Sequence, residues 1–303
     1  MRPAWSVILL TTLIGAGQGL FLALFAAELA GLGGSTLFVP GAAVSLALLG
    51  AGLAASFFHL GRPERAWRSA AMWRTSWLSR EVIVLPAFMA AVLAWGAAHA
   101  LGKPTLALGV AGAVLALALF VCTGMIYACL PFLQEWRTPL TVVNFTLLGS
   151  ASGLSAAAAL AALLHTPLAR PYVIAALAVG ALAYLGRLAS LVRNTRLRPK
   201  STLATAIGVK HPRIVQIAQG AMGGSFNTRE FFHGRPREVV RAARWSLLAL
   251  VFPLPALLLL AGKLSAPLLG AAFLLQYAGL LAERWYFFAE AKHPQNLYYQ
   301  AIA

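Results

Sequence analysis

The sequence predicts an all-α polytopic membrane protein, a bundle of eight transmembrane helices in a single membrane domain of residues 1–303. Hydrophobic residues make up 60% of the chain and its mean hydropathy is +0.78, both far above the values of soluble domains. Apolar runs of about 20 residues, the length that crosses a bilayer, recur along the whole chain. Basic residues gather in alternate connections between these runs.

The apolar runs are separated by segments that contain Gly, Pro or charged residues, which end helices. The first run is too long for the core of a signal peptide, so we expect a retained span. Only two connections are long, residues 61–80 and 193–244. The expected spans lie near residues 5–32, 40–60, 81–101, 105–130, 139–164, 171–192, 245–262 and 266–289.

The charge balance predicts the orientation of the bundle. The chain has 24 Lys and Arg residues and 8 acidic residues, all of them Glu. With eight spans, three of the 24 basic residues (Lys103, Arg170 and Lys263) fall on one side and the other 21 on the side of both termini. By the positive-inside rule, both termini and both long loops are expected in the cytoplasm, in a bacterial inner (cytoplasmic) membrane. Basic loops of this kind bind anionic lipids, and we expect no nucleic acid partner.

Polar residues cluster at the cytoplasmic boundary of two spans. His59 is followed by Gly61 and Pro63, which end its helix. Histidine exchanges protons near neutral pH, so it could serve a lipid-soluble substrate, although an interfacial His bonded to a backbone carbonyl is the alternative. Glu81 begins the next span near the same boundary and either caps that helix or joins His59 in proton-coupled chemistry. Arg65 could orient the substrate or hold Glu81 ionised.

The polar residues inside the expected spans include Gln18, Asn144, Glu283 and Arg284. Ionisable groups within a membrane normally face a partner or a cavity. Adjacent helix positions point about 100° apart, so we expect Glu283 and Arg284 to need separate partners. Glu28 lies toward the opposite boundary and is expected to extend its carboxylate to water.

The sequence favours no metal and no haem in this chain. Cys122 and Cys129 lie seven apart in one apolar run and are expected to be packing residues, because they form no Cys-x-x-Cys or Cys/His ligand set for an iron–sulfur cluster or zinc. A b-type haem needs two imidazoles that face each other. The candidate pair, His99 and His165, sits at helix ends on the non-cytoplasmic side, which favours the absence of haem.

Two motifs then resemble a known family, the membrane anchor subunits of dimethyl sulfoxide reductase and its relatives. That family has eight helices, a His-Leu-Gly-x-Pro-x-Arg-Ala motif after helix 2 and a Ser-x-Leu-Ser-x-Glu motif at the start of helix 3. The stretch AERWYFF also resembles the family's helix-8 ending, with a match at Arg284. The matching residues are His59, Leu60, Gly61, Pro63, Arg65 and Ala66 in the first motif, and Ser76, Leu78, Ser79 and Glu81 in the second.

The resemblance implies a haem-free subunit without a catalytic centre of its own. It would anchor a molybdopterin catalytic subunit and an iron–sulfur subunit, and would bind ubiquinone or menaquinone close to the partner's clusters. His59 would contact the quinone, while Arg65 and Glu81 shape the site. Gln18 and Arg284 are further candidates for quinone binding or proton transfer.

The expected orientation narrows the choice within the family. In dimethyl sulfoxide reductase the motif side faces the periplasm, whereas here the basic motif loop is expected in the cytoplasm, with the partner subunits. This resembles the three-subunit sulfite-oxidising complex, so we expect sulfite oxidation with quinone reduction, an activity like that of sulfite dehydrogenase (quinone). Two alternatives stay open: the anchor of a dimethyl sulfoxide or polysulfide-type reductase that oxidises quinol, and a membrane transporter.

The long loops supply the expected docking residues: Arg62, Arg68, Arg74, Phe231, Phe232 and Arg235. The alternative is that the second loop is a basic loop that faces lipid. FFHLGRPER and FFHGRPRE, at 57–65 and 231–238, are similar, which indicates either an internal repeat or a coincidence in Arg-rich sequence.

Overall fold

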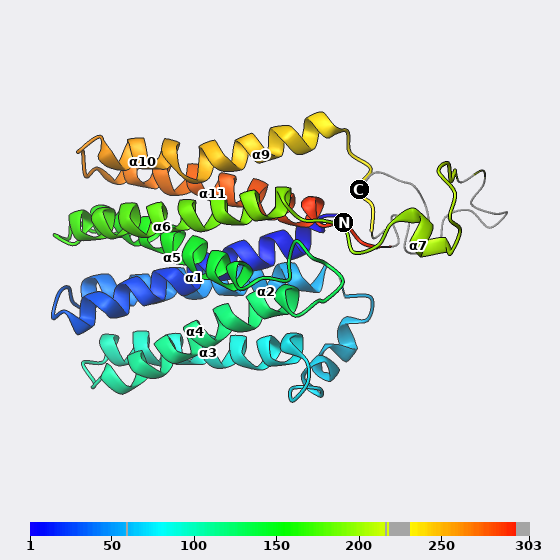
Figure 1. Ribbon diagram of the computed structural model, residues 1–303. Helices are drawn as coiled ribbons and strands as arrows, with labels where there is room; N and C mark the ends of the chain where they lie inside the picture. Colours follow the sequence, from blue (N-terminus) through cyan, green and yellow to red (C-terminus); the bar gives the residue numbers. More distant parts are fainter. Residues whose placement is uncertain (59, 216, 218–230, 295–303) are drawn as a thin grey trace.

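The computed structural model describes residues 1–58, 60–215, 217 and 231–294 and shows a bundle of long helices (Figure 1). Within these residues, eight helices are long and apolar enough to cross a membrane, so the all-α, eight-span prediction is confirmed. Seven spans are single helices: α1 (Trp5–Leu29), α2 (Ser35–Phe57), α3 (Trp77–Ala100), α4 (Leu106–Ala128), α5 (Pro139–Leu163), α6 (Ala169–Thr195) and α11 (Ala266–Glu290). The remaining span joins α9 (Arg237–Val251) to α10 (Pro253–Leu260), and the connections carry η1 (Pro63–Ala70) and α7 (Leu203–Ile207).

Several helices begin earlier than the apolar runs do. α3 begins at Trp77, where Ser76 caps the helix by accepting the N–H of Ser79 at 3.3 Å. α9 begins at Arg237, well before the expected 245. Hydropathy identifies only the part of a helix that suits hydrocarbon, whereas the helix continues through the interface, where Arg and Trp side chains extend to water.

The first helix lies in the middle of the bundle and packs against α2, α4, α5 and α11. Its contact with α5 is made by backbone atoms, because a Cβ on Gly153 would lie only 2.0 Å from the carbonyl carbon of Gly19. Small residues let helices approach closely in membranes. This close contact fixes the position of α1 relative to α5.

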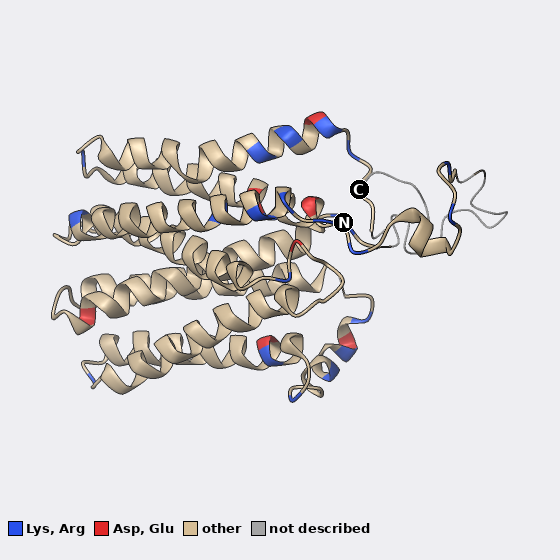
Figure 2. Cartoon of the chain, in the orientation of Figure 1, with Lys and Arg blue, Asp and Glu red and all other residues tan. Residues whose placement is uncertain are grey.

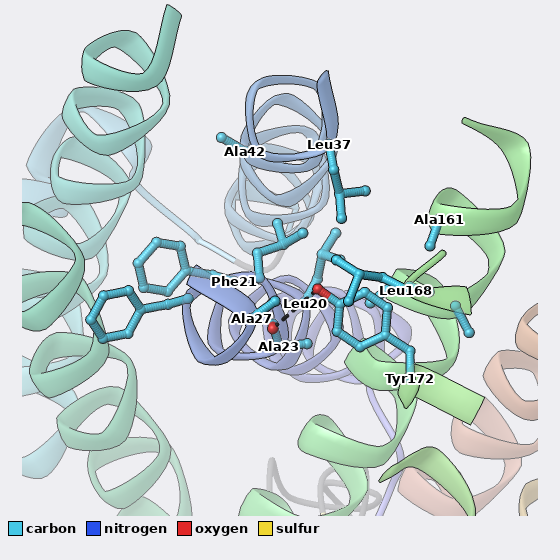
Figure 3. Packing of buried hydrophobic residues seen from close by; sticks show 14 of the residues in the cluster. Leu20, Phe21, Ala23, Ala27, Leu37, Ala42, Ala161, Leu168 and Tyr172 are labelled. Atoms are coloured by element: carbon cyan, nitrogen blue, oxygen red, sulfur yellow. Dashed lines mark hydrogen bonds between the residues drawn. The ribbon is translucent and has the colours of Figure 1, made fainter. Parts of the chain in front are cut away.

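Apolar side chains fill the space between α1 and its neighbours (Figure 3). Leu20 and Phe21 of α1 are fully buried, and Leu37 lies among the same cluster from α2. Tyr172 of α6 donates its hydroxyl to the carbonyl of Ala23 at 3.3 Å. Around α1, the helices therefore pack directly against one another through buried apolar side chains.

The two ends of the bundle differ in charge (Figure 2). Most Lys and Arg residues lie at one end, where the amino group of Met1 donates to the carbonyl of Ala291 at 2.7 Å. We call this the terminal end and the other the opposite end. The opposite end carries Lys103, Arg170 and Lys263 in its connections and helix starts. That the terminal end faces the cytoplasm remains a prediction of the positive-inside rule.

Candidate functional site

Three of the predicted site residues meet around one internal cavity. Gln18 from α1, Glu81 from α3 and Arg284 from α11 lie in its wall, and the cavity has a volume of about 20 Å³. All three side chains are buried, at 1%, 7% and 4% exposure. We call this space the Glu81 cavity. Its other polar wall residues are Thr11, Thr12, Thr123 and Ser152.

The polar groups of the Glu81 cavity are anchored by neighbouring helices. The hydroxyl of Thr123 on α4 donates to the carboxylate of Glu81. The amide of Gln18 donates to the carbonyl of Ala116, also on α4, at 2.8 Å. Both contacts join α4 to another helix, so the positions of these groups depend on the packing of α4 against α1 and α3.

A buried group of three charges lies beside this cavity. The carboxylate of Glu283 lies 3.1 Å from Nε of Arg187 on α6 and 3.3 Å from Nε of Arg284. We call Arg187, Glu283 and Arg284 the ion triad. The expectation of separate partners for Glu283 and Arg284 is wrong, because the long Arg284 side chain turns back to its neighbour and also covers the ring of Phe145 at 3.5 Å. Burial makes an unpaired charge costly and so favours this shared arrangement.

A second, smaller cavity of about 10 Å³ borders the ion triad. We call it the triad cavity. Arg284 lies in the walls of both cavities. Asn144 of α5 donates to the hydroxyl of Ser190 on α6 at 2.7 Å beside it. The other polar wall residues are Glu135, Thr141 and Asn194.

Sequence reasoning alone does not identify the role of Arg187. In the charge balance it is one of the basic residues of the terminal side, although it lies about two turns before the end of α6. A lone charge within an apolar run indicates a buried partner. That signal is present, but nothing in the sequence connects Arg187 to Glu283, 96 positions away.

The first motif is only partly described. His59 lies outside the described residues. Arg65 is 52% exposed and its Nε lies 3.9 Å from Glu64, so the structure does not bring it to the Glu81 cavity. Asn144, expected only to find a partner or cavity, lies beside the ion triad.

The motif loop is held by a residue that the sequence did not distinguish. Arg80 donates to the carbonyls of Trp73 and Arg74 at 2.9 and 2.8 Å, and its guanidinium lies 4.2 Å from the ring centre of Trp77. These contacts tie the end of the loop to the start of α3. The docking candidates Arg62, Arg68 and Arg74 are exposed at the terminal end.

The second set of docking candidates is partly covered by the chain itself. Phe231 stacks on His293 with ring centres 3.7 Å apart, and Phe232 is half-buried. Arg235 is exposed, and its backbone N–H donates to Nδ1 of His233 at 3.0 Å. The aromatic pair therefore contributes to the described fold near the end of α11.

Comparison with known proteins gives the family of the chain. Residues 1–299 match the model of the DMSO reductase anchor subunit (DmsC). The chain belongs to the DMSO reductase anchor subunit family. It is also 55% identical, over an alignment of 327 residues that covers 100% of both chains, to a sulfite dehydrogenase subunit from Allochromatium vinosum. As a member of the family, this anchor subunit is a multi-pass membrane component of an oxidoreductase complex.

The opposite end of the anchor subunit holds a different polar group. Glu28 accepts the indole N–H of Trp95 at 2.7 Å and the hydroxyl of Thr105, and lies 3.2 Å from Nε2 of His99. The expectation that Glu28 extends to water is wrong, because its carboxylate joins α1, α3 and the start of α4. His99 therefore faces a carboxylate and the Trp95 ring. Among the described residues, no group of three or more His, Cys, Asp and Glu could hold a metal.

The Glu81 cavity has the groups for proton exchange but not the volume for a large ligand. A water molecule needs roughly 10–15 Å³ in this measure, so about 20 Å³ holds one water. Pockets for organic ligands measure about 300–1,000 Å³. A quinone ring therefore does not fit inside this cavity. The cavity has room for one bound water beside the carboxylate, hydroxyl and amide groups of its wall.

Proposed function

We propose that this anchor subunit binds quinone at the terminal end and passes electrons between iron–sulfur clusters of a partner and the membrane quinone pool. The observation that carries the proposal is the meeting of Gln18, Glu81 and Arg284, from three helices, around one cavity. Family membership supports it, and the name of the A. vinosum relative supports sulfite oxidation as the source of electrons. We infer net quinone reduction.

The proposed quinone ring lies outside the Glu81 cavity, at the surface between the end of α2 and the start of α3. Phe57, Phe58 and Leu78 are exposed there, at 47%, 89% and 51%. Large exposed apolar side chains at a membrane boundary suit an amphipathic, lipid-soluble ligand. In this arrangement His59 contacts the ring, and Glu81 exchanges protons behind it. Arg65 supplies a positive charge at the membrane surface.

The proposed partners dock on the terminal end, from the cytoplasm. Trp67 and Trp73 are exposed at 71% and 53%, beside the exposed Arg68 and Arg74. Exposed Trp and Arg are typical of protein interfaces and of membrane surfaces. We propose that an iron–sulfur subunit binds this loop together with Arg62 and Arg235, with the molybdopterin subunit beyond it.

The quinone assignment is tested by His59→Ala in the complete complex. We expect the complex to assemble, because α2 ends at Phe57, before this position, and to lose electron transfer to quinone. Co-purification of the partner subunits measures assembly, and reduction of decylubiquinone measures the function. Retained quinone reduction in an assembled His59→Ala complex would remove His59 from the site.

The orientation has its own test. A C-terminal fluorescent protein or alkaline phosphatase fusion reports the side of the terminal end. We expect fluorescence and no phosphatase activity. Phosphatase activity would place the terminal end in the periplasm and contradict the cytoplasmic docking of the partners.

A further inference from the structure

We propose that the ion triad and its two cavities form a proton path from the surface of the terminal end to Glu81. The path would deliver protons for quinone reduction, so the inference rests on the proposed quinone site. It assigns a role to Arg187, which the family motifs do not include, and to Glu283, which stands beside Arg284 in the AERWYFF stretch.

The path begins at two half-buried carboxylates of the terminal end. Glu135 lies in the loop between α4 and α5 and lines the triad cavity. Glu290, the last residue of α11, hydrogen-bonds to the side chain of Asn194, which also lines that cavity. With Glu283, these residues are three of only eight acidic residues in the chain. Their grouping provides proton acceptors between bulk water and the triad.

The triad cavity has unmet hydrogen-bonding capacity. Oδ1 of Asn144 and Nη2 of Arg187 are buried and have no protein hydrogen-bond partner in the described part of the chain. Buried polar groups are normally satisfied by protein or by water. The cavity volume of about 10 Å³ is near the minimum for one water molecule. A water bound here would bridge these groups to the carboxylate of Glu283.

Arg284 lies in the walls of both cavities, as does Phe145. A guanidinium stays protonated in proteins, so Arg284 does not carry the proton. It fixes the Glu283 carboxylate at 3.3 Å and can donate its other N–H groups to water on either side. The residues Thr11, Thr12 and Ser152 lie with Glu81 in the wall of the Glu81 cavity.

The charges around Glu283 come from several elements. Arg187 approaches from α6 and Arg284 from α11, while Glu135 lies across the triad cavity on the α4–α5 loop. Arg244 of α9 acts electrostatically on the neighbouring Glu290. In the proposed path, Glu283 receives protons from the side of Glu135 and passes them toward Glu81.

The electrons and protons of quinone reduction balance with the partners already proposed. Each quinone that is reduced to quinol takes an electron pair from the partner's clusters and a pair of protons. The path supplies these protons from the water at the terminal end through Glu283 and Glu81. No further oxidant or reductant is needed.

The test compares six forms of the complete, detergent-solubilised complex with decylubiquinone as acceptor. They are wild type, Glu283→Gln, the double variant Glu283→Gln/Arg187→Gln, the entrance variant Glu135→Gln/Glu290→Gln, Glu81→Gln and Glu28→Gln. Glu283→Gln removes the proton acceptor but adds a positive charge to the triad, and the double variant restores the original net charge. Glu28→Gln is the matched control, because it makes the same change in a half-buried carboxylate at the opposite end. A pH-indicator dye follows proton uptake, and quenching of a fluorescent hydroxyquinoline analogue follows occupancy of the quinone site.

We expect Glu283→Gln to slow quinone reduction by about tenfold or more, within the range of lost acid–base catalysis. The rate should fall more steeply with rising pH than in wild type and show a larger solvent isotope effect. Proton uptake should slow equally, while binding of the quinone analogue stays unchanged. The double variant should stay slow, the entrance variant should show the same steeper pH profile, and Glu28→Gln should resemble wild type.

Recovery of the rate in the double variant would overturn the path, because Glu283 would then act only as a counter-ion. Wild-type rates and pH profile in the entrance variant, or in Glu283→Gln, would also overturn it. If any of these results is found while Glu81→Gln abolishes quinone reduction, the proposed quinone site stands and only the proton path fails. If Glu81→Gln also retains full activity, the proposed function fails as well.

Discussion

Glu283 at the terminal end and Glu28 at the opposite end are both carboxylates within the bundle, yet their surroundings differ. Glu28 is 14% exposed and has three polar neighbours, Trp95, Thr105 and His99. Glu283 is fully buried between two guanidiniums and borders a cavity with unmet polar groups. Glu28 lies in the wall of neither the Glu81 cavity nor the triad cavity.

This difference matches the roles that we propose, a structural one for Glu28 and a chemical one for Glu283. The bonds of Glu28 are made by side chains of α3 and by a residue beside α4, so they join helices and leave little capacity for another ligand. At the terminal end, burial of charge next to space for water costs stability and is retained where function needs it. The residue type is the same, and only the surroundings distinguish the roles.

The largest expected effect comes from removing the carboxylate of the Glu81 cavity. Glu81→Gln keeps the shape of the side chain but removes its proton exchange, so quinone reduction should fall by roughly 10²-fold or more. Glu28→Gln should retain most of the wild-type rate. Both rates are measured with decylubiquinone in the assembled complex. Equal losses in the two variants would remove the distinction between the two ends.

A smaller effect is expected on stability. Arg187→Ala leaves the carboxylate of Glu283 with one guanidinium and should lower the free energy of unfolding by about 3–5 kcal/mol, the usual cost of breaking a buried ion pair. Thermal unfolding of the solubilised complex measures the loss. Arg170→Ala, an exposed residue at the opposite end, is the control and should change stability little. If Arg187→Ala left the free energy of unfolding unchanged, the triad would be hydrated well enough to lose one partner.

The corresponding change at the opposite end should be milder. Trp95→Phe removes the indole N–H that Glu28 accepts and should cost about 1–3 kcal/mol, the penalty for leaving a buried acceptor unsatisfied. Quinone reduction should be unchanged. A clear loss of quinone reduction in this variant would show that the opposite end also takes part in the reaction.

The smallest effect concerns pH and the end of α11. Burial, followed by the nearby positive amino group of Met1, lowers the pKa of His293 below 6.5. The folded state therefore favours the neutral imidazole, and its stability should be fully present above pH 6.5 and decline as the pH falls below that value. Hydrogen exchange of residues 291–294 measures the effect, which should be lost in His293→Phe. Protection that increases on acidification would contradict the sign.

Much of the fold could be predicted from the sequence because its causes are local. Bilayer thickness sets the length of an apolar run, and Gly and Pro mark the breaks, so eight spans were predicted correctly. The predicted bounds were less accurate where helices such as α9 continue into the interface. Gln18 and Arg284 were identified as candidates because polar residues are rare in apolar helices, and Glu81 because it begins a span near His59 and belongs to a family motif. Their meeting around one cavity depends on contacts between distant segments and could not be predicted from any one of them.

The sequence by itself determined the membrane class, the number of spans, the charge asymmetry of the two ends and the motifs of the anchor subunit family. These properties follow from composition and local spacing. Only the tertiary structure decided that Arg284 turns back to Glu283, that Arg187 completes the triad across the bundle and that Glu28 is held by Trp95 and Thr105. The reason is physical: in a bundle, the partner of a buried polar group is chosen by helix packing, which brings together residues far apart in the chain.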